Sequence, residues 1–252
     1  MKITFRCDPA LLGLLPPPVL ARAALPDWLR AMAPRVESAM HGRSIRTLKQ
    51  CPPFVDAMGH GFLILLPCDV RVSQGRFAWD WPLPPLASAH HPRAPLSFHV
   101  PEQLQGSPLA QRDATGSPQV AIKFNSFWTI GVEPGWSLMA THPINRDDLP
   151  FRLVTGLVDA DRFVDAGINF PAVWTEPDFE GSLPRGTPVA QCFAVPRDLP
   201  ELVCEAMDAA QLARQAQLMA DVAAGPGVYR KRYRSKRGSE LGNKRGSQSD
   251  GA

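Results

Sequence analysis

The stretches Thr155-Gly-Leu-Val-Asp-Ala-Asp161 and Leu183-Pro-Arg-Gly-Thr-Pro-Val-Ala-Gln191 each join an apolar strand pattern to turn-forming residues. Gly, Pro and Asp favour turns, and short apolar runs between them favour strands. The same pattern recurs from residue 119 to residue 197. The expected strands are Val120–Phe124, Phe127–Val132, Trp136–Thr141, Leu153–Val158, Ile168–Trp174 and Pro188–Val195. Because no helical pattern separates these strands, the sequence predicts a mainly β core shaped as a barrel or clip.

Together with the segments outside these strands, the chain is expected to have four parts. Residues 51–82 favour paired strands, with a hairpin in which Gln74-Gly75 forms the turn. Apolar residues recur at helical spacing near the C-terminus, and a basic tail rich in Gly and Ser follows them. The expected divisions are an irregular, short-helical N-terminal cover at 1–50, a β-rich core at 51–199, a C-terminal helix at 200–224 and a disordered basic tail at 225–252.

The composition agrees with a β-rich protein. Of 252 residues, 44% are hydrophobic and 27 are proline, which is excluded from helix interiors and central strands. Five scattered cysteines form no Cys-x-x-Cys pair, which favours reduced thiols in the cytoplasm. No apolar run approaches the roughly 20 residues of a membrane helix, so no membrane partner is expected.

The charge and the missing motifs narrow the function classes. From Gly225 onward eight basic residues stand against two acidic ones, a net charge of +6, whereas the rest of the chain has 19 basic and 22 acidic residues, a net charge of −3. A nucleic-acid partner is therefore expected only through the tail at 230–245. The chain has no GxxxxGK[ST], GxGxxG, GxSxG or HExxH motif, so simple kinase, α/β-hydrolase and zincin activities lack support.

The order of the segments within residues 133–197 resembles the dUTPase family. Glu133-Pro-Gly-Trp-Ser-Leu-Met-Ala140 matches a Pro-Gly turn into a strand, and the Asp-Ala-Asp161 and Val-Ala-Gln191 segments follow in the family's order. The resemblance implies a dUTPase-like β-clip core and a homotrimer. It places Asp159 where that family's catalytic carboxylate orients and deprotonates the attacking water. Asp161 and Gln191 are further candidate ligand-binding residues, and the resemblance places Gln191 where the side chain braces the site or an interface.

The same residues allow other interpretations. Asp159 and Asp161 can shape a strand-to-loop turn by bonding nearby backbone groups. Where the dUTPase family has a Pro-Arg-Ser phosphate motif, this chain has Thr141-His-Pro-Ile-Asn-Arg146, which leaves a triphosphate few donors. The chain is also similar to a bacterial and phage-borne family without an established activity. That similarity rests on Cys51-Pro-Pro-Phe-Val-Asp-Ala57 and His142-Pro-Ile-Asn-Arg146, and it implies no mechanism.

The segment His142–Arg146 is a second candidate ligand site. His142 can act as an acid, a base or a metal ligand near neutral pH, and Arg146 can bind a carboxylate or phosphate through two parallel hydrogen bonds. Asn145 suits a tight turn. The alternative is a turn stabilised by Asn145, with Arg146 paired to a neighbouring aspartate at 147 or 148. The sequence leaves both interpretations open.

The histidines also allow a metal site. His60, His99 and His142 lie in or beside expected strands, and three nitrogen or oxygen ligands suffice for a catalytic metal. A divalent metal is thus a candidate cofactor, and the alternative is that these are loop histidines without a metal. The leading hypothesis is a small-molecule or anion-binding module. The alternatives are an enzyme, acting through Asp159 or through a histidine-bound metal, and a structural or phage-assembly protein.

Overall fold

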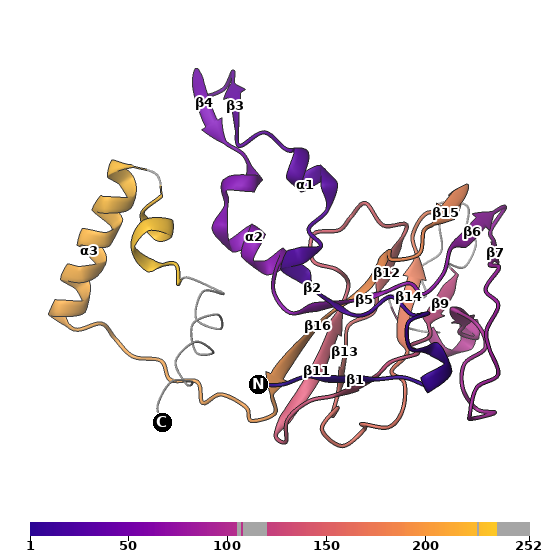
Figure 1. Cartoon of the computed structure of the whole chain (residues 1–252). Helices are drawn as coiled ribbons and strands as arrows, with labels where there is room; N and C mark the ends of the chain where they lie inside the picture. The colour runs from indigo at the N-terminus through magenta and orange to yellow at the C-terminus, as the bar shows by residue number, and fades with distance from the viewer. Residues whose placement is uncertain (105–106, 108–119, 226, 236–252) are drawn as a thin grey trace, which may run out of the picture. The chain divides into compact units, whose positions relative to one another are not determined.

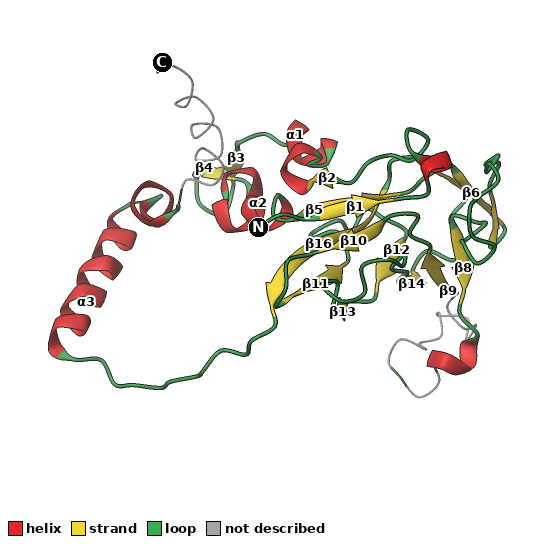
Figure 2. Ribbon diagram, turned by 60° about the horizontal axis from the view of Figure 1, so that its bottom comes forward, coloured by secondary structure: helices red, strands yellow, loops and turns green. Residues whose placement is uncertain are grey.

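The computed structural model describes residues 1–104, 107, 120–225 and 227–235, which belong to two compact units. The first unit, Met1–Leu199, is mainly β-structure, as expected, and the second begins at Pro200. The strand pairs among the described residues are all antiparallel. Figure 1 labels the elements in chain order, and Figure 2 distinguishes helices from strands.

The largest sheet has five strands in the order β13-β11-β16-β5-β2. Its central strand is β16, Pro188–Pro196, which pairs with β11 on one side and with β5 on the other. The flanking strands are β11 (Trp136–Thr141), β5 (Phe62–Leu65), β13 (Gly156–Val158) and β2 (Val19–Leu20). Residues 189–193 of β16 are all buried, so this strand is covered on both faces.

The remaining strands form smaller sheets. A four-stranded sheet contains β12 (Phe151–Leu153), β14 (Phe170–Trp174), β9 (Ala121–Phe124) and β8 (Leu96–Phe98), in that order. A three-stranded sheet contains β15 (Gly181–Leu183), β6 (Val70–Ser73) and β7 (Arg76–Ala78). Two separate pairs are β1 (Thr4–Arg6) with β10 (Thr129–Gly131), and β3 (Arg35–Ser38) with β4 (Arg43–Arg46).

Short helices interrupt the N-terminal part of the first unit. They are α1 (Asp27–Ala31), α2 (Pro52–Met58) and 3-10 turns at Pro9–Leu11, Ala21–Ala23, Leu48–Gln50 and Pro101–Leu104. Pro52 and Pro53 occupy the first turn of α2, where a missing N–H group costs no helical hydrogen bond. This helix is a correction, because residues 51–82 were expected to form only paired strands.

The sheets share one hydrophobic core. Leu138 and Ala190 of the five-stranded sheet pack in the same cluster as Phe124 of the four-stranded sheet and Val72 of the three-stranded sheet. Aromatic rings fill much of the volume: the rings of Phe124 and Phe151 lie 4.7 Å apart, in a tilted arrangement. Val70 and Val72 are buried while Arg71 and Ser73 are exposed, which is the alternation that predicted this strand.

The start of β5 is fixed by a close backbone contact. Gly61 adopts a left-handed φ of +70°, and a Cβ atom there would lie 2.1 Å from the carbonyl oxygen of Cys192. Only glycine permits so close an approach of one backbone to another. This glycine therefore allows β5 to pair with β16.

Several sequence expectations need correction in detail. The expected hairpin is present, with Val72 opposite Phe77. The single strand expected at 153–158 is two strands: Leu153 pairs with Ala172 in the four-stranded sheet, and Gly156 pairs with Ala140 in the five-stranded sheet. The chain changes sheets between them, which local strand propensity does not reveal.

The second unit also differs from expectation. Helix α3 spans Ala209–Ala224 rather than starting at residue 200, because Asp208 caps it: Asp208 accepts a hydrogen bond from the Gln211 amide, and the Gln211 side chain accepts one from the Asp208 amide. Part of the tail expected to be disordered, Tyr229–Tyr233, is a π-helical turn, and residues 236–252 lie outside the described residues. Within the described part of the chain, no helix is long and apolar enough to cross a membrane.

Candidate functional site

Two polar clusters lie at opposite ends of β11. At its start, Ser137 pairs with Val195, and at its end Thr141 pairs with Gln191. Four residues of a strand span about 13 Å, and this length separates the two clusters. The sequence alone could not place them relative to one another. We call them the carboxylate cluster (Gly135, Ser137, Asp159, Asp161, Arg197) and the turn cluster (residues 142–148 with Gln191).

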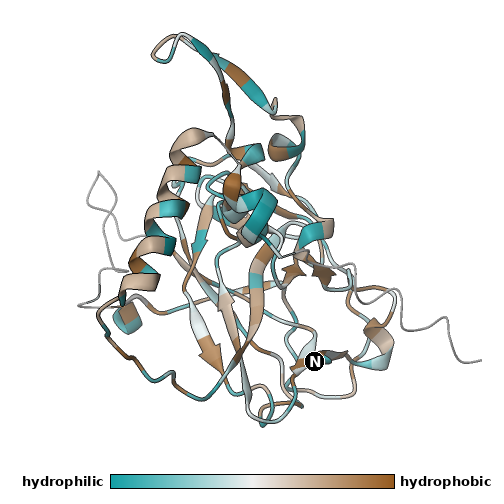
Figure 3. Ribbon diagram, turned by 90° about the vertical axis from the view of Figure 1, so that its left-hand side faces the viewer, coloured by the Kyte–Doolittle hydropathy of each residue, from teal (hydrophilic) through white to brown (hydrophobic). Residues whose placement is uncertain are grey.

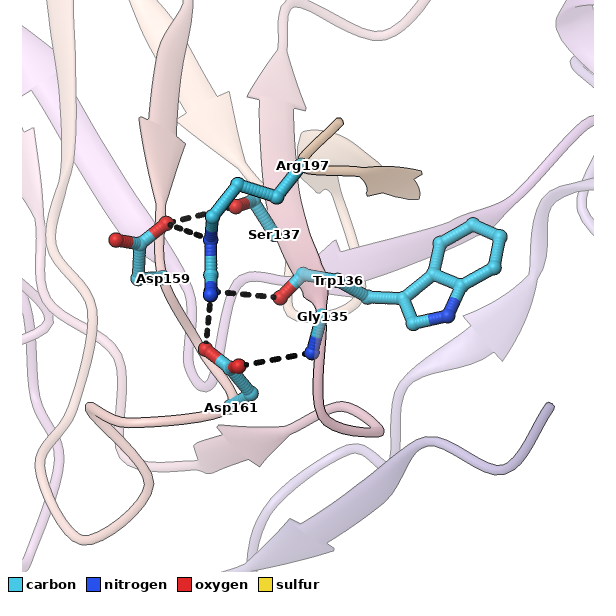
Figure 4. Close-up of polar contacts among 6 residues, drawn as sticks. All are labelled: Gly135, Trp136, Ser137, Asp159, Asp161 and Arg197. Atoms are coloured by element: carbon cyan, nitrogen blue, oxygen red, sulfur yellow. Dashed lines mark hydrogen bonds and ion pairs between the residues drawn. The ribbon is translucent and has the colours of Figure 1, made fainter. Parts of the chain in front are cut away.

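Arg197 holds the carboxylate cluster together (Figure 4). Its Nε lies 3.2 Å from Asp159 Oδ1, and its Nη2 donates to Asp161 Oδ1 and, over 3.3 Å, to the carbonyl oxygen of Trp136. The Ser137 hydroxyl donates to Asp159 Oδ1 over 2.7 Å, and the Gly135 amide donates to Asp161 Oδ2 over 3.1 Å. The two carboxylates thus bond residues far away in the sequence rather than only their own turn.

These contacts set the protonation of both carboxylates. The hydrogen bond from Ser137 and the charge of Arg197 lower the pKa of Asp159. The hydrogen bond from Arg197, followed by that from the Gly135 amide, lowers the pKa of Asp161. A carboxylate whose pKa is lowered is a weaker base, so this geometry does not favour proton abstraction from water by Asp159. The side chain of Asp159 is half exposed, whereas that of Asp161 is almost completely covered.

The centre of the turn cluster is the side chain of Gln191, which is 1% exposed. Its Oε1 accepts from the Ile144 amide over 2.9 Å. Its Nε2 donates to the carbonyl oxygens of His60, Ala57 and Met58 over 2.7, 3.1 and 3.3 Å. One buried amide therefore connects the turn after β11 to the end of α2 and the start of β5. The partners of Gln191 in this structure are backbone groups of its own chain, so its expected role in ligand binding stays a prediction.

Both ring nitrogens of His142 contact the backbone. Nδ1 accepts from the Leu153 amide over 3.3 Å, so Nε2, which lies 3.0 Å from the carbonyl oxygen of Arg146, carries the proton. Burial lowers the pKa of His142 and thereby favours the neutral ring. This arrangement orients the turn and uses both nitrogens that a metal would need.

Arg146 makes a two-pronged ion pair with Asp148. Its Nε and Nη2 donate to Oδ1 and Oδ2 of the carboxylate over 2.8 and 2.9 Å. The Arg146 side chain is 14% exposed and that of Asp148 is 42% exposed. Burial raises the pKa of Asp148, but the hydrogen bonds and charge of Arg146, with a hydrogen bond from Trp28, lower it overall. Asn145 lies beside this pair with a left-handed φ of 56°.

Arg146 also lines a small cavity. It is lined by Arg146 and Gln191 together with the apolar residues Ala24, Leu25, Pro26, Met58, Leu63, Pro143 and Ile144. Its volume of about 10 Å³ is close to the minimum for one water molecule, so the cavity as it stands has no room for a small ligand.

The three candidate metal ligands are not brought together. His60 is exposed and stacks on Phe193 with ring centroids 5.4 Å apart, and His99 contacts Gln103 through Nδ1 over 2.9 Å. Among the residues that the structure describes, no group of three or more His, Cys, Asp or Glu side chains is placed to hold a metal ion. The expected trio with His142 therefore has no geometric basis.

No family model and no curated protein matches the chain. Among solved structures, a mutant dUTPase of Staphylococcus bacteriophage 80alpha with dUpNHpp aligns at a TM-score of 0.26 and 13% identity, over 45% of this chain and 89% of that chain. A likeness at this level does not establish a shared fold.

Sequence reasoning missed three residues of the carboxylate cluster. Gly135, Ser137 and Arg197 were not candidate site residues, and each is ordinary in its local sequence. Their roles follow from the register between β11 and β16, which places residue 137 opposite residue 195. The sequence did contain a signal for this cluster, because Arg197 directly follows one apolar strand, and Asp159 and Asp161 follow another.

Proposed function

We propose that this chain is a small-molecule or anion-binding module built on a β-clip-like core, and that Arg146 is its anion contact. The observation that carries the proposal is the two-pronged pair between Arg146 and Asp148 beside a cavity. A planar guanidinium recognises carboxylate and phosphate groups through this same pair of parallel hydrogen bonds.

In this proposal the Asp148 carboxylate occupies the place of the ligand anion. Arg146 is largely covered, so its orientation is set by the surrounding protein, whereas Asp148 is nearly half exposed. A ligand carboxylate or phosphate would displace Asp148 into water, where its charge is well solvated, and would leave the guanidinium in place. Competition with an internal carboxylate would make binding of a simple anion weak.

The test is a thermal-shift series with phosphate, sulfate and a set of mono- and dicarboxylates. A ligand that binds only the folded state raises the melting temperature by mass action. Asp148→Asn should increase the shift at a given ligand concentration, because it removes the competing charge, and Arg146→Lys should abolish it. Asp147→Asn and Arg152→Lys are matched controls at exposed positions nearby. A shift that is the same in Arg146→Lys and wild type would overturn the proposal.

A further inference from the structure

The β3–β4 hairpin is a basic segment of the first unit. Residues 1–199 contain 18 basic and 18 acidic residues, a net charge of zero. The hairpin with its loop, residues 35–46, contains three arginines (Arg35, Arg43, Arg46) and one acidic residue (Glu37), a net charge of +2. The rest of the unit therefore carries −2. The neutral total conceals a basic arm on a mildly acidic body.

The arm projects from the body of the first unit (Figure 1). Its two strands form a sheet of their own, and hydrophilic and hydrophobic residues alternate along it, as the hairpin at the top of Figure 3 shows. Its base is closed by the Thr47 hydroxyl, which donates to the Ala33 carbonyl over 2.6 Å, and by the Thr47 amide, which donates to the Pro34 carbonyl over 3.2 Å. The arm is thus anchored at its base; most of β3 and the connecting loop are exposed, whereas Ser44, Ile45 and Arg46 of β4 are partly buried.

The pairing register places like charges together. Arg35 lies directly opposite Arg46, and like charges at directly opposed positions destabilise a hairpin. The Arg35 guanidinium turns to Ser44, donating to its hydroxyl over 3.2 Å and to its carbonyl over 2.6 Å. Opposite charges at the Arg35–Arg46 position would stabilise an isolated hairpin. Phosphates bound along the arm would offset the repulsion between these two arginines.

The tip of the arm carries an apolar side chain. Met40, in the loop that joins β3 to β4, is 90% exposed. Exposed apolar side chains at the ends of DNA-binding elements act as wedges between base steps. A two-stranded ribbon also fits the major groove of B-form DNA. The deep, narrow major groove of A-form RNA does not admit such a ribbon.

We propose that the β3–β4 hairpin is an arm that binds double-stranded DNA, with Arg43 and Arg46 contacting phosphates and Met40 contacting a base step. This binding is separate from the anion site at Arg146. It also extends the nucleic-acid contact that the sequence suggested only for the C-terminal tail. The footprint is sequence-independent, because its cations contact the backbone.

The experiment measures binding of the full-length protein to a fluorescent duplex of about 20 base pairs by anisotropy, between about 50 and 200 mM NaCl. Arg43→Ala/Arg46→Ala should weaken binding about ten-fold or more and lower the slope of log affinity against log salt by about 1.8, from about 0.9 per phosphate contact. Arg43→Lys/Arg46→Lys retains both charges and should retain the slope. Met40→Ser should weaken binding about three- to ten-fold without changing the slope.

The control is a second hairpin of the same unit. Arg71→Ala/Arg76→Ala removes two exposed arginines from β6 and β7 and should leave the affinity within about two-fold of wild type. The C-terminal tail is present in every variant, so it cannot produce a difference between the two arginine pairs. Equal losses in both pairs, no loss in either, no binding by the wild type, or stronger binding to an RNA duplex of the same sequence would each overturn the proposal.

Discussion

The Gln191 side chain donates a hydrogen bond of 2.7 Å to the carbonyl oxygen of His60, 131 residues earlier in the chain. The same side chain accepts a hydrogen bond from the Ile144 amide, so a single residue of β16 fixes the position of two loops. The buried side-chain amide of Gln191, in the neighbouring strand, thus positions the turn that carries Arg146.

Gln191→Leu should destabilise the protein by about 2–4 kcal/mol, because it leaves several buried backbone groups without partners while keeping the volume nearly constant. The measurement is urea unfolding followed by circular dichroism. Gln215→Leu, at an exposed position of α3, is the control and should have little effect. A loss below about 0.5 kcal/mol would show that the hydrogen bonds of Gln191 contribute little net stability.

The pKa of His142 should be lower in the folded protein than in the urea-unfolded chain, because burial disfavours the charged ring. Between the two values the unfolded chain binds more protons, so stability rises with pH. The contribution is fully present above the unfolded value of about 6.5 and decreases as the pH falls below it. An NMR titration of the His142 ring in both states tests this prediction, which an equal or higher folded pKa would contradict.

The carboxylate cluster should make stability sensitive to acid. The pKa values of Asp159 and Asp161 are lowered in the folded state, so the unfolded chain binds protons first as the pH falls. Their stabilising contribution is present above about pH 4 and is lost below it. Arg197→Met removes the shared cation and should flatten the dependence of the urea midpoint on pH between about 5 and 2.5. Arg152→Met, at an exposed position of β12, should leave that dependence unchanged.

The cysteines should differ in reactivity according to burial. All five thiols are free; Cys192 and Cys68 are buried, and Cys204 is exposed. Burial raises the pKa of Cys68 to about 11 and also raises that of Cys192, so neither forms the reactive thiolate at neutral pH. Iodoacetamide should label Cys204 in the native protein and the two buried thiols only after unfolding. Peptide mass spectrometry measures the order, and early labelling of Cys192 would contradict it.

The sequence predicts local elements well and their partners poorly. The hairpin of β6 and β7 is predictable because alternating side chains and the Gln74-Gly75 turn act within a few residues. The division of 153–158 between two sheets depends on pairing with Ala172 and Ala140, which no local pattern specifies. The β3–β4 hairpin was missed although Val36 and Ile45 alternate with polar residues, because its four-residue loop at 39–42 lacks the two-residue turn signal that marks the β6–β7 hairpin.

The same distinction applies to the candidate site. The sequence singled out Asp159, Asp161, His142, Arg146 and Gln191 as polar residues next to strands. The structure supplies their partners: Arg197 lies 36 residues from Asp161, and Leu153 lies 11 residues from His142. These long-range contacts use the groups that a ligand or metal would use. Residue type therefore identified where polar groups gather, and only the strand register identified which groups they bind.

Gly61 limits which amino acids the chain can carry at position 61. The carbonyl of Cys192 fills the space where any side chain at position 61 would begin. Alanine, the smallest substitution, would already force β5 away from β16 and would move the backbone carbonyl of His60 away from Gln191. We expect saturation mutagenesis with a folding reporter to tolerate glycine alone at this position. Position 61 therefore holds the turn around Arg146 in place indirectly, through β5 and the hydrogen bonds of Gln191.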